Sequence, residues 1–136
     1  MRNNVPVIDL ERTFDEREFL VSKTDTKGRI LYCNKAFINI SGFTEEELLG
    51  QPHNIVRHPD MPEAAFQDLW DTVQNGREWH GIVKNRCKDG GFYWVDAPVT
   101  PSVNASNQTV GYMSIRRKPS AQQIEDAKRL YATMAV

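Results

Sequence analysis

Gly50-Gln-Pro-His-Asn-Ile-Val-Arg-His-Pro-Asp-Met-Pro62 contains three prolines among polar side chains and separates the two halves of this chain. Each proline fixes its own φ and removes a backbone donor, and it also pushes the preceding residue toward extended geometry. The segment therefore cannot form one regular helix, and we expect an ordered loop or broken single turns. Ordered loops of this kind often carry binding residues, and the candidates here are His53, Asn54, Arg57, His58 and Asp60.

Two strand-like runs and two short helices precede this loop. Residues 19–25 and 29–33 flank a glycine-containing turn and predict a hairpin. Asn34 is a suitable N-cap for a short helix. Thr44, with a glutamate three positions later, predicts a capping box at the start of a second helix.

A helix and three strands are predicted after the loop. Residues 63–75 repeat their apolar side chains with the helical period. Strand-like runs follow at residues 79–87, 92–99 and 110–117, with a polar loop at 102–108. Tyr93 and Trp94 are neighbours on one strand, so they point to opposite faces. We expect one of them in the core or a pocket and the other in an exposed patch.

The order of these elements predicts an α+β fold. Two early strands and three late ones suit a five-stranded antiparallel sheet with short helices over one face. We expect one domain at residues 14–118, an N-terminal arm or cap at residues 1–13, and a C-terminal amphipathic helix at residues 119–136. The last helix is expected to lead to a downstream module.

The composition is that of an ordinary globular protein. The chain has 136 residues and a formal net charge of −1, which gives no reason to expect nucleic-acid binding. It has no apolar run of membrane-spanning length and no signal-peptide pattern, so we expect a cytoplasmic domain without membrane contact of its own. The two cysteines, Cys33 and Cys87, are expected to be reduced and packed.

The chain resembles PAS domains from about residue 18 to residue 117. The resemblance is carried by Thr24-Asp-Thr-Lys-Gly-Arg-Ile30, Tyr32-Cys-Asn-Lys-Ala-Phe37, Ser41-Gly-Phe-Thr-Glu-Glu-Glu-Leu-Leu-Gly50, Lys84-Asn-Arg-Cys-Lys-Asp-Gly90, Tyr93-Trp-Val95 and Gly111-Tyr-Met-Ser-Ile-Arg116. Within that family it is most similar to the PAS domains of aerotaxis receptors, through the loop quoted first and the run Gly81-Ile-Val-Lys-Asn-Arg86.

This resemblance implies a sensor domain and not an enzyme. It implies non-covalent binding of FAD, and transmission of the flavin's redox state to a chemotaxis signalling module further along the chain. It also implies a homodimer, and a full-length receptor that is tethered to the membrane. Reduction would change hydrogen bonding at flavin N5, so that Asn85 or Asn34 reorients and the sheet passes the change on.

Three of the candidate residues are assigned to the flavin ring. An amide offers both a donor and an acceptor, which suits the imide edge of the ring. Asn85, on a central strand, is therefore the first candidate, and Asn34 is a second if it faces the cleft as well as capping its helix. His53 lies where the resemblance implies a ring contact.

The other candidates are assigned to the phosphates and to stacking. Arg57 and His58 suit the pyrophosphate or ribose end, because arginine pairs well with phosphate oxygens. Asp60 would orient Arg57 or His58, or accept a hydrogen bond from a ribose hydroxyl. Trp70 and Trp79 are candidates for stacking on the ring or the adenine. No metal site is expected.

Several alternatives remain at this stage. In a haem-binding PAS sensor, His53, His58 or His80 would be the axial ligand. A cofactor-free dimerisation module would use the N-terminal arm and the terminal helix. Photochemistry through a thiol adduct is disfavoured, since no cysteine lies between Cys33 and Cys87. Phosphate-binding and dinucleotide-binding glycine patterns are absent from the sequence.

Overall fold

The computed structural model describes residue 4 and residues 6–134. The elements in chain order are β1 (Leu20–Thr24), β2 (Ile30–Cys33), α1 (Lys35–Ser41), α2 (Glu45–Leu48), the 3₁₀ turn η1 (His53–Val56), α3 (Glu63–Gln74), β3 (Trp79–Arg86), β4 (Phe92–Val103), β5 (Thr109–Arg116) and α4 (Ala121–Met134). The predicted arm includes residues 1–3 and 5, and the predicted last helix includes residues 135–136; these six lie outside the described residues.

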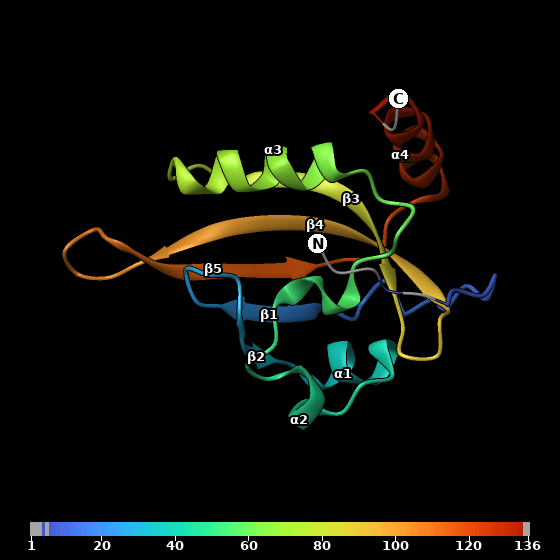
Figure 1. Cartoon of the computed structure of the whole chain (residues 1–136), viewed down its shortest axis with the longest axis horizontal. Helices are drawn as coiled ribbons and strands as arrows, with labels where there is room; N and C mark the ends of the chain where they lie inside the picture. The colour runs from blue at the N-terminus through green and yellow to red at the C-terminus, as the bar shows by residue number, and fades with distance from the viewer. Residues whose placement is uncertain (1–3, 5, 135–136) are drawn as a thin grey trace.

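The strands form one antiparallel sheet in the order β2-β1-β5-β4-β3. Helices α1 and α2 lie beside β1 and β2, α3 runs along β3 and β4, and η1 crosses in front of β1 and β5 (Figure 1). The predicted α+β fold, a five-stranded antiparallel sheet with short helices on one face, is confirmed. Its central strand, β5, pairs with the first and the fourth strand in the sequence.

The helix caps and the proline-rich segment predicted from the sequence are found at the predicted positions. The Asn34 side chain accepts a hydrogen bond from Phe37 N and caps α1, which ends at Gly42 with a left-handed φ of 77°. Thr44 and Glu47 form the predicted capping box of α2. The proline-rich segment contains only the single turn η1, as expected from its backbone restrictions.

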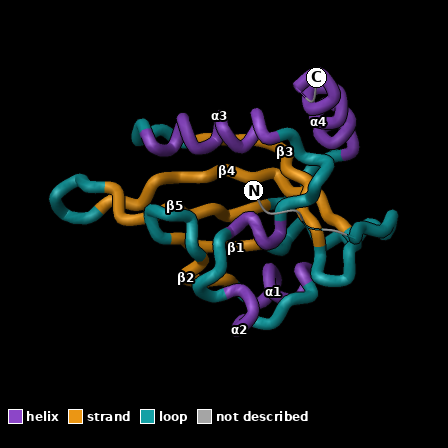
Figure 2. The backbone as a smooth tube through the Cα atoms, viewed as in Figure 1, coloured by secondary structure: helices purple, strands orange, loops and turns teal. Residues whose placement is uncertain are grey.

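Two expectations about the late strands are wrong. Strand β4 does not end at residue 99 but continues through Val103, because its far end pairs with β5. The β4–β5 hairpin therefore extends beyond the rest of the sheet (Figure 2). Trp94 is not in an exposed patch: it is only 7% exposed, since α4 and the N-terminal segment flank it on the face opposite the cavity.

The core lies between the sheet and the covering helices. Its fully buried members include Leu20, Ile30, Phe37, Val73 and Tyr93. Within the part of the chain that the structure describes, no helix combines the length and the apolar character needed to cross a bilayer.

Candidate ligand-binding site

A cavity of about 340 Å³ lies between the inner face of the sheet and the segment from η1 to α3. Its size is at the lower end of the range for small-molecule sites. Of the eight residues predicted for the site, Asn85, His53, Arg57, Trp70 and Trp79 line this cavity. The proline-rich loop and four strands, β1, β3, β4 and β5, thus come together as a binding site requires.

Two tryptophans form aromatic walls, and each depends on a glycine. The Trp79 ring folds back over Gly81 on the same strand, and a Cβ at Gly81 would come within 2.2 Å of the ring. Trp79 Nε1 also donates to Asp68 of α3 at 2.9 Å, which holds the ring in place. Trp70 packs edge-to-face on Tyr112 with centroids 5.5 Å apart. A Cβ at Gly28 would touch the Trp70 ring at 3.1 Å.

Polar groups without partners lie among these apolar walls. Arg57 stacks on Phe66, 3.5 Å from its centroid. Among the described residues, Arg57 Nε and Asn54 Oδ1 are buried without hydrogen-bond partners. The Asn85 side chain is only 4% exposed and lines the same cavity. Because buried polar groups are usually hydrogen-bonded, this set indicates a ligand with both donors and acceptors.

A buried arginine is the strongest electrostatic feature of the cavity. Arg116, on β5, is 6% exposed, and no acidic side chain of the described residues forms a salt bridge with it. It donates to His53 Nε2 at 2.9 Å and, more weakly, to Leu20 O at 3.4 Å. A buried cation without a counter-charge is costly, so the site is suited to a ligand that is anionic or becomes so.

The contact with Arg116 determines the tautomer of His53. A guanidinium can only donate hydrogen bonds, so Nε2 must accept and the ring proton lies on Nδ1. Ser22 Oγ lies 3.0 Å from the same Nε2. Burial, and then the Arg116 charge, lower the pKa of His53 to about 3. Burial lowers the pKa of Arg116 to about 10, so at neutral pH the pair is an uncharged imidazole beside a cation.

This pair predicts a pH dependence of stability. In the unfolded chain, His53 takes up a proton near its ordinary pKa of 6.5, whereas the folded ring stays neutral down to about pH 3. Below pH 6.5 the unfolded state therefore binds more protons, and the free energy of unfolding falls by up to about 1.4 kcal/mol per pH unit. Urea unfolding at pH 6.5, 5.5 and 4.5 gives the free energy of unfolding at each pH. This free energy should change clearly less with pH in His53→Gln than in the wild type. An equal pH dependence in both proteins would contradict a neutral, buried His53 in the folded state.

Three predicted site residues do not line the cavity, and each has another structural role. The Asn34 amide is fully engaged: Oδ1 accepts from Val21 N and Phe37 N, and Nδ2 donates to Phe19 O at 2.8 Å. His58 is 2% exposed, and its Nδ1 accepts from Asp60 N. Asp60 pairs with Lys84 at 2.8 Å, and that hydrogen bond lowers the pKa of its carboxyl.

These three side chains are placed to support the cavity from outside. Asn34 orients α1, and Phe37 of that helix packs against the His53 ring with centroids 5.8 Å apart. His58 and Asp60 order the end of the loop that carries Arg57. The cavity lining includes none of the three, so their direct contact with a ligand stays a prediction from the sequence.

Asn34→Ala should mainly cost stability. The substitution removes the cap of α1 and leaves Val21 N and Phe19 O without this partner, so we expect a loss of about 2 kcal/mol in the free energy of unfolding. Asn34→Asp keeps the cap acceptor but loses the donor to Phe19 O, and it should cost less. Urea denaturation of both variants measures the difference. If Asn34→Ala had the same urea midpoint as the wild type, the hydrogen bonds of the Asn34 amide would contribute little to stability.

The structure also places residues in the site that the sequence analysis did not single out. Arg116, Ser22, Ser114, Tyr112 and Phe66 all line the cavity. Arg116, Ser114 and Tyr112 alternate along β5, so an inward-facing arginine on a predicted strand was the available signal. That signal was obscured by the neighbouring Arg117, because the sequence alone does not say which arginine faces inward.

The family model described as PAS fold matches residues 30–116, and the chain belongs to the PAS family. A relative in Escherichia coli (strain K12), an aerotaxis receptor, is 48% identical over 115 residues, which cover 85% of this chain and 22% of the receptor. The domain is thus a PAS domain of the aerotaxis-receptor type. A nitrogen fixation regulatory protein of Klebsiella pneumoniae is 28% identical over 121 residues, covering 88% of this chain and 24% of that protein.

Solved structures agree with the fold. The dark structure of the blue-light photoreceptor Aureochrome1 LOV has a TM-score of 0.74 at 17% identity, covering 84% of this chain and 85% of that one. A PAS domain from Colwellia psychrerythraea has a TM-score of 0.67 at 28% identity, covering 74% and 86%. The chain spans less than a quarter of the length of the two curated relatives above.

Proposed function

We propose that this PAS domain binds a flavin non-covalently, as FAD, in the cavity beneath η1, and that it is the cytoplasmic redox- or oxygen-sensing input domain of a larger signalling protein. The observation that carries the proposal is the composition of the cavity. Flat aromatic walls from Trp70 and Trp79 enclose Asn85, Arg57 and Arg116; among the described residues Arg57 Nε is buried without a hydrogen-bond partner, and Arg116 forms no salt bridge with an acidic side chain. A planar, polar-edged, redox-active ring fits that combination.

Each part of the cavity has a role in this proposal. The Asn85 amide would hold the polar edge of the ring, with the tryptophan rings beside its faces. Arg57 would pair with phosphate oxygens, and the part of FAD beyond the ring would extend outside a cavity of about 340 Å³. A bound flavin would supply reversible electron uptake; Arg116 would stabilise the added negative charge, and His53 would keep its proton on Nδ1.

Signal transfer would begin at Asn85. Its amide can exchange donor and acceptor by rotation, whereas the Asn34 amide is held by three hydrogen bonds. The Asn85 backbone also forms a bridge with Arg57 and pairs with Tyr93 of β4. A reorientation of Asn85 would therefore act on the loop and the sheet together. Two states of the sheet, each favoured by one redox form, are required for any output.

The names of the relatives support a role in a signalling chain. One is an aerotaxis receptor and the other a nitrogen fixation regulatory protein, and both are much longer than this domain. We propose that the output passes to a downstream signalling domain and that the domain works as a homodimer. Neither Cys33 nor Cys87 lines the cavity, which argues against light sensing through a thiol adduct.

The proposal is tested by titrating ligand-free protein with FAD and following flavin fluorescence. We expect saturable binding by the wild type and a loss of at least about tenfold for Asn85→Asp, because a carboxylate loses the amide donors and adds a buried negative charge. Asn104→Asp, on the exposed β4–β5 turn, is the matched control and should bind like the wild type. Absence of saturable binding by the wild type would leave the cofactor-free dimerisation module as the better account.

A further inference from the structure

The N-terminal segment lies against the site through an unusual set of hydrogen bonds. Asn4 is 8% exposed, and its Nδ2 donates to the carbonyl oxygens of Asn54 at 2.9 Å, Ile55 at 3.3 Å and Arg57 at 2.8 Å. All three carbonyls belong to η1 and the residue that ends it. One amide group of the arm thus holds the turn that places His53 and Arg57 in the cavity.

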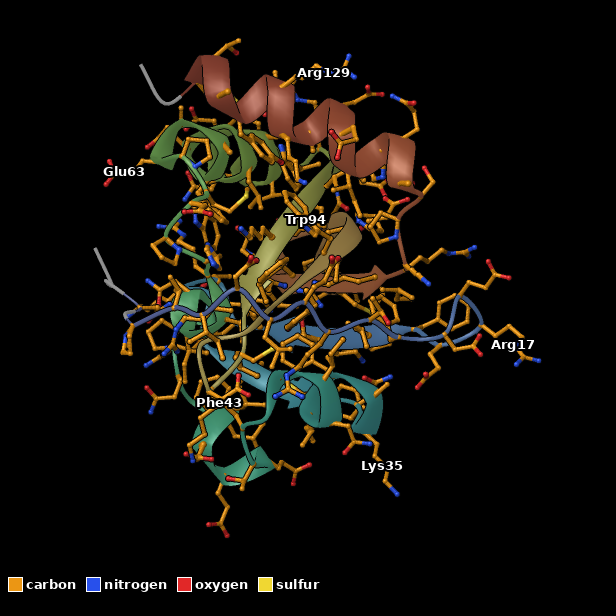
Figure 3. All side chains as sticks on the ribbon, turned by 90° about the vertical axis from the view of Figure 1, so that its right-hand side faces the viewer. Arg17, Lys35, Phe43, Glu63, Trp94 and Arg129 are labelled. Atoms are coloured by element: carbon orange, nitrogen blue, oxygen red, sulfur yellow. The ribbon has the colours of Figure 1, made fainter. Side chains whose placement is uncertain are left out.

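The rest of the segment is fixed to the β3–β4 hairpin. Ile8 N donates to Gly90 O at 2.9 Å, Phe92 N donates to Leu10 O at 2.9 Å, and Arg12 N donates to Phe92 O at 2.7 Å. Figure 3 shows the segment crossing in front of this hairpin, with Trp94 on the side toward α4. We name residue 4 together with residues 6–12 the strap.

The hairpin is shaped to accept the strap. A Cβ at Gly90 would come within 3.0 Å of Pro6 O, and one at Gly91 within 2.9 Å of Leu10 O. Arg86 donates to Pro6 O from Nε at 3.1 Å and from Nη2 at 2.9 Å, and Arg12 forms an ion pair with Asp89. The two glycines at the turn therefore permit a close backbone contact, and the strap holds Asn4 at a set position.

We propose that Asn4 is a positioning residue for the ligand site, acting through the η1 carbonyls on His53 and Arg57. Its contribution to ligand binding rests on the proposed function. Coupling between two sites is reciprocal, so if Asn4 tightens ligand binding by some factor, bound ligand must tighten the contact of the strap with η1 by the same factor. The strap is then a part of the domain whose attachment depends on the state of the cavity.

The test compares Asn4→Asp with Arg12→Ala. The aspartate has almost the shape of asparagine but turns an oxygen toward three carbonyls, so the turn should loosen. Arg12→Ala removes an exposed ion pair at the other end of the strap and leaves the Asn4 contacts in place. Hydrogen exchange of ligand-free protein should show the amides of Ile55 and Arg57, which donate within the turn, exchanging at least about tenfold faster in Asn4→Asp. The amide of Lys88, bonded to Ser41 O, should be unchanged.

Binding gives the second readout. FAD affinity should fall at least about tenfold in Asn4→Asp and less than about twofold in Arg12→Ala, both measured under conditions in which urea curves show each variant to be folded. Unchanged exchange at Ile55 and Arg57 would overturn the inference whether or not the protein binds flavin. Faster exchange in a protein that binds no flavin would support the positioning role and refute only the proposed function. Faster exchange with wild-type FAD affinity would overturn the role in binding.

Discussion

Gly81→Ala is expected to weaken flavin binding on the order of 100-fold, equivalent to about 2.7 kcal/mol. The new Cβ would lie 2.2 Å from the Trp79 ring, so the ring must leave its present position. Its Nε1 is tethered to Asp68 of α3, which restricts the direction in which it can move. The ring would tilt into the cavity and occupy part of the ligand volume, while overpacking costs about 1–3 kcal/mol of stability.

The control for this prediction is a double-mutant cycle with Trp79→Leu. Without the large ring, the Cβ at Gly81 has no clash to create, so Gly81→Ala should change affinity less than about threefold in the Trp79→Leu background. Isothermal titration with FAD measures all four proteins. If the Gly81→Ala single variant remains folded and binds FAD like the wild type, the present position of the Trp79 ring is not required for flavin binding.

Arg116→Met should lower the midpoint potential of the bound flavin by about 60 mV or more per electron. A buried positive charge stabilises an electron added nearby, and a loss of about 1.4 kcal/mol corresponds to about 59 mV for one electron. The measurement is a reductive titration with a reference dye at pH 8, where His53 is neutral. Methionine is apolar and flexible enough to fill part of the vacated space.

Two further variants separate charge from shape. Arg116→Lys keeps a cation in the cavity and should retain most of the wild-type potential. Arg117→Met removes the adjacent arginine, which is exposed and stacks on Phe19 with its Cζ 5.0 Å from the centroid. It should leave the potential unchanged. A wild-type potential in Arg116→Met would contradict the electrostatic role of the buried arginine.

Most of the fold follows from local signals in the sequence. The cap at Asn34, the capping box at Thr44 and the three prolines after Gly50 each restrict the backbone over a few residues, and the elements begin and end near them. The length of β4 was missed because Pro101 and the polar residues after it weaken the strand signal. Pairing with β5 across the sheet compensates for that weakness.

The candidate site was only partly predictable. Residues identified by type, such as Asn85, Arg57 and Trp79, do line the cavity. Asn34, His58 and Asp60 do not, because polar side chains in a loop or at a helix end are readily used for local hydrogen bonds. Arg116 was missed because the strand pattern does not say whether it or Arg117 faces inward, and Asn4 was missed because its position depends on contacts at least 50 residues away along the chain. Such long-range contacts leave no local pattern in the sequence.

The most direct test of the central proposal is the visible absorption spectrum of freshly purified protein, before and after dithionite. We predict two flavin bands that bleach on reduction and return in air, and release of FAD on heating. A sharp Soret band would instead identify a haem protein. A protein that stays colourless after incubation with FAD and FMN would contradict the account, because the cavity walled by Trp70 and Trp79 would then not bind a flavin.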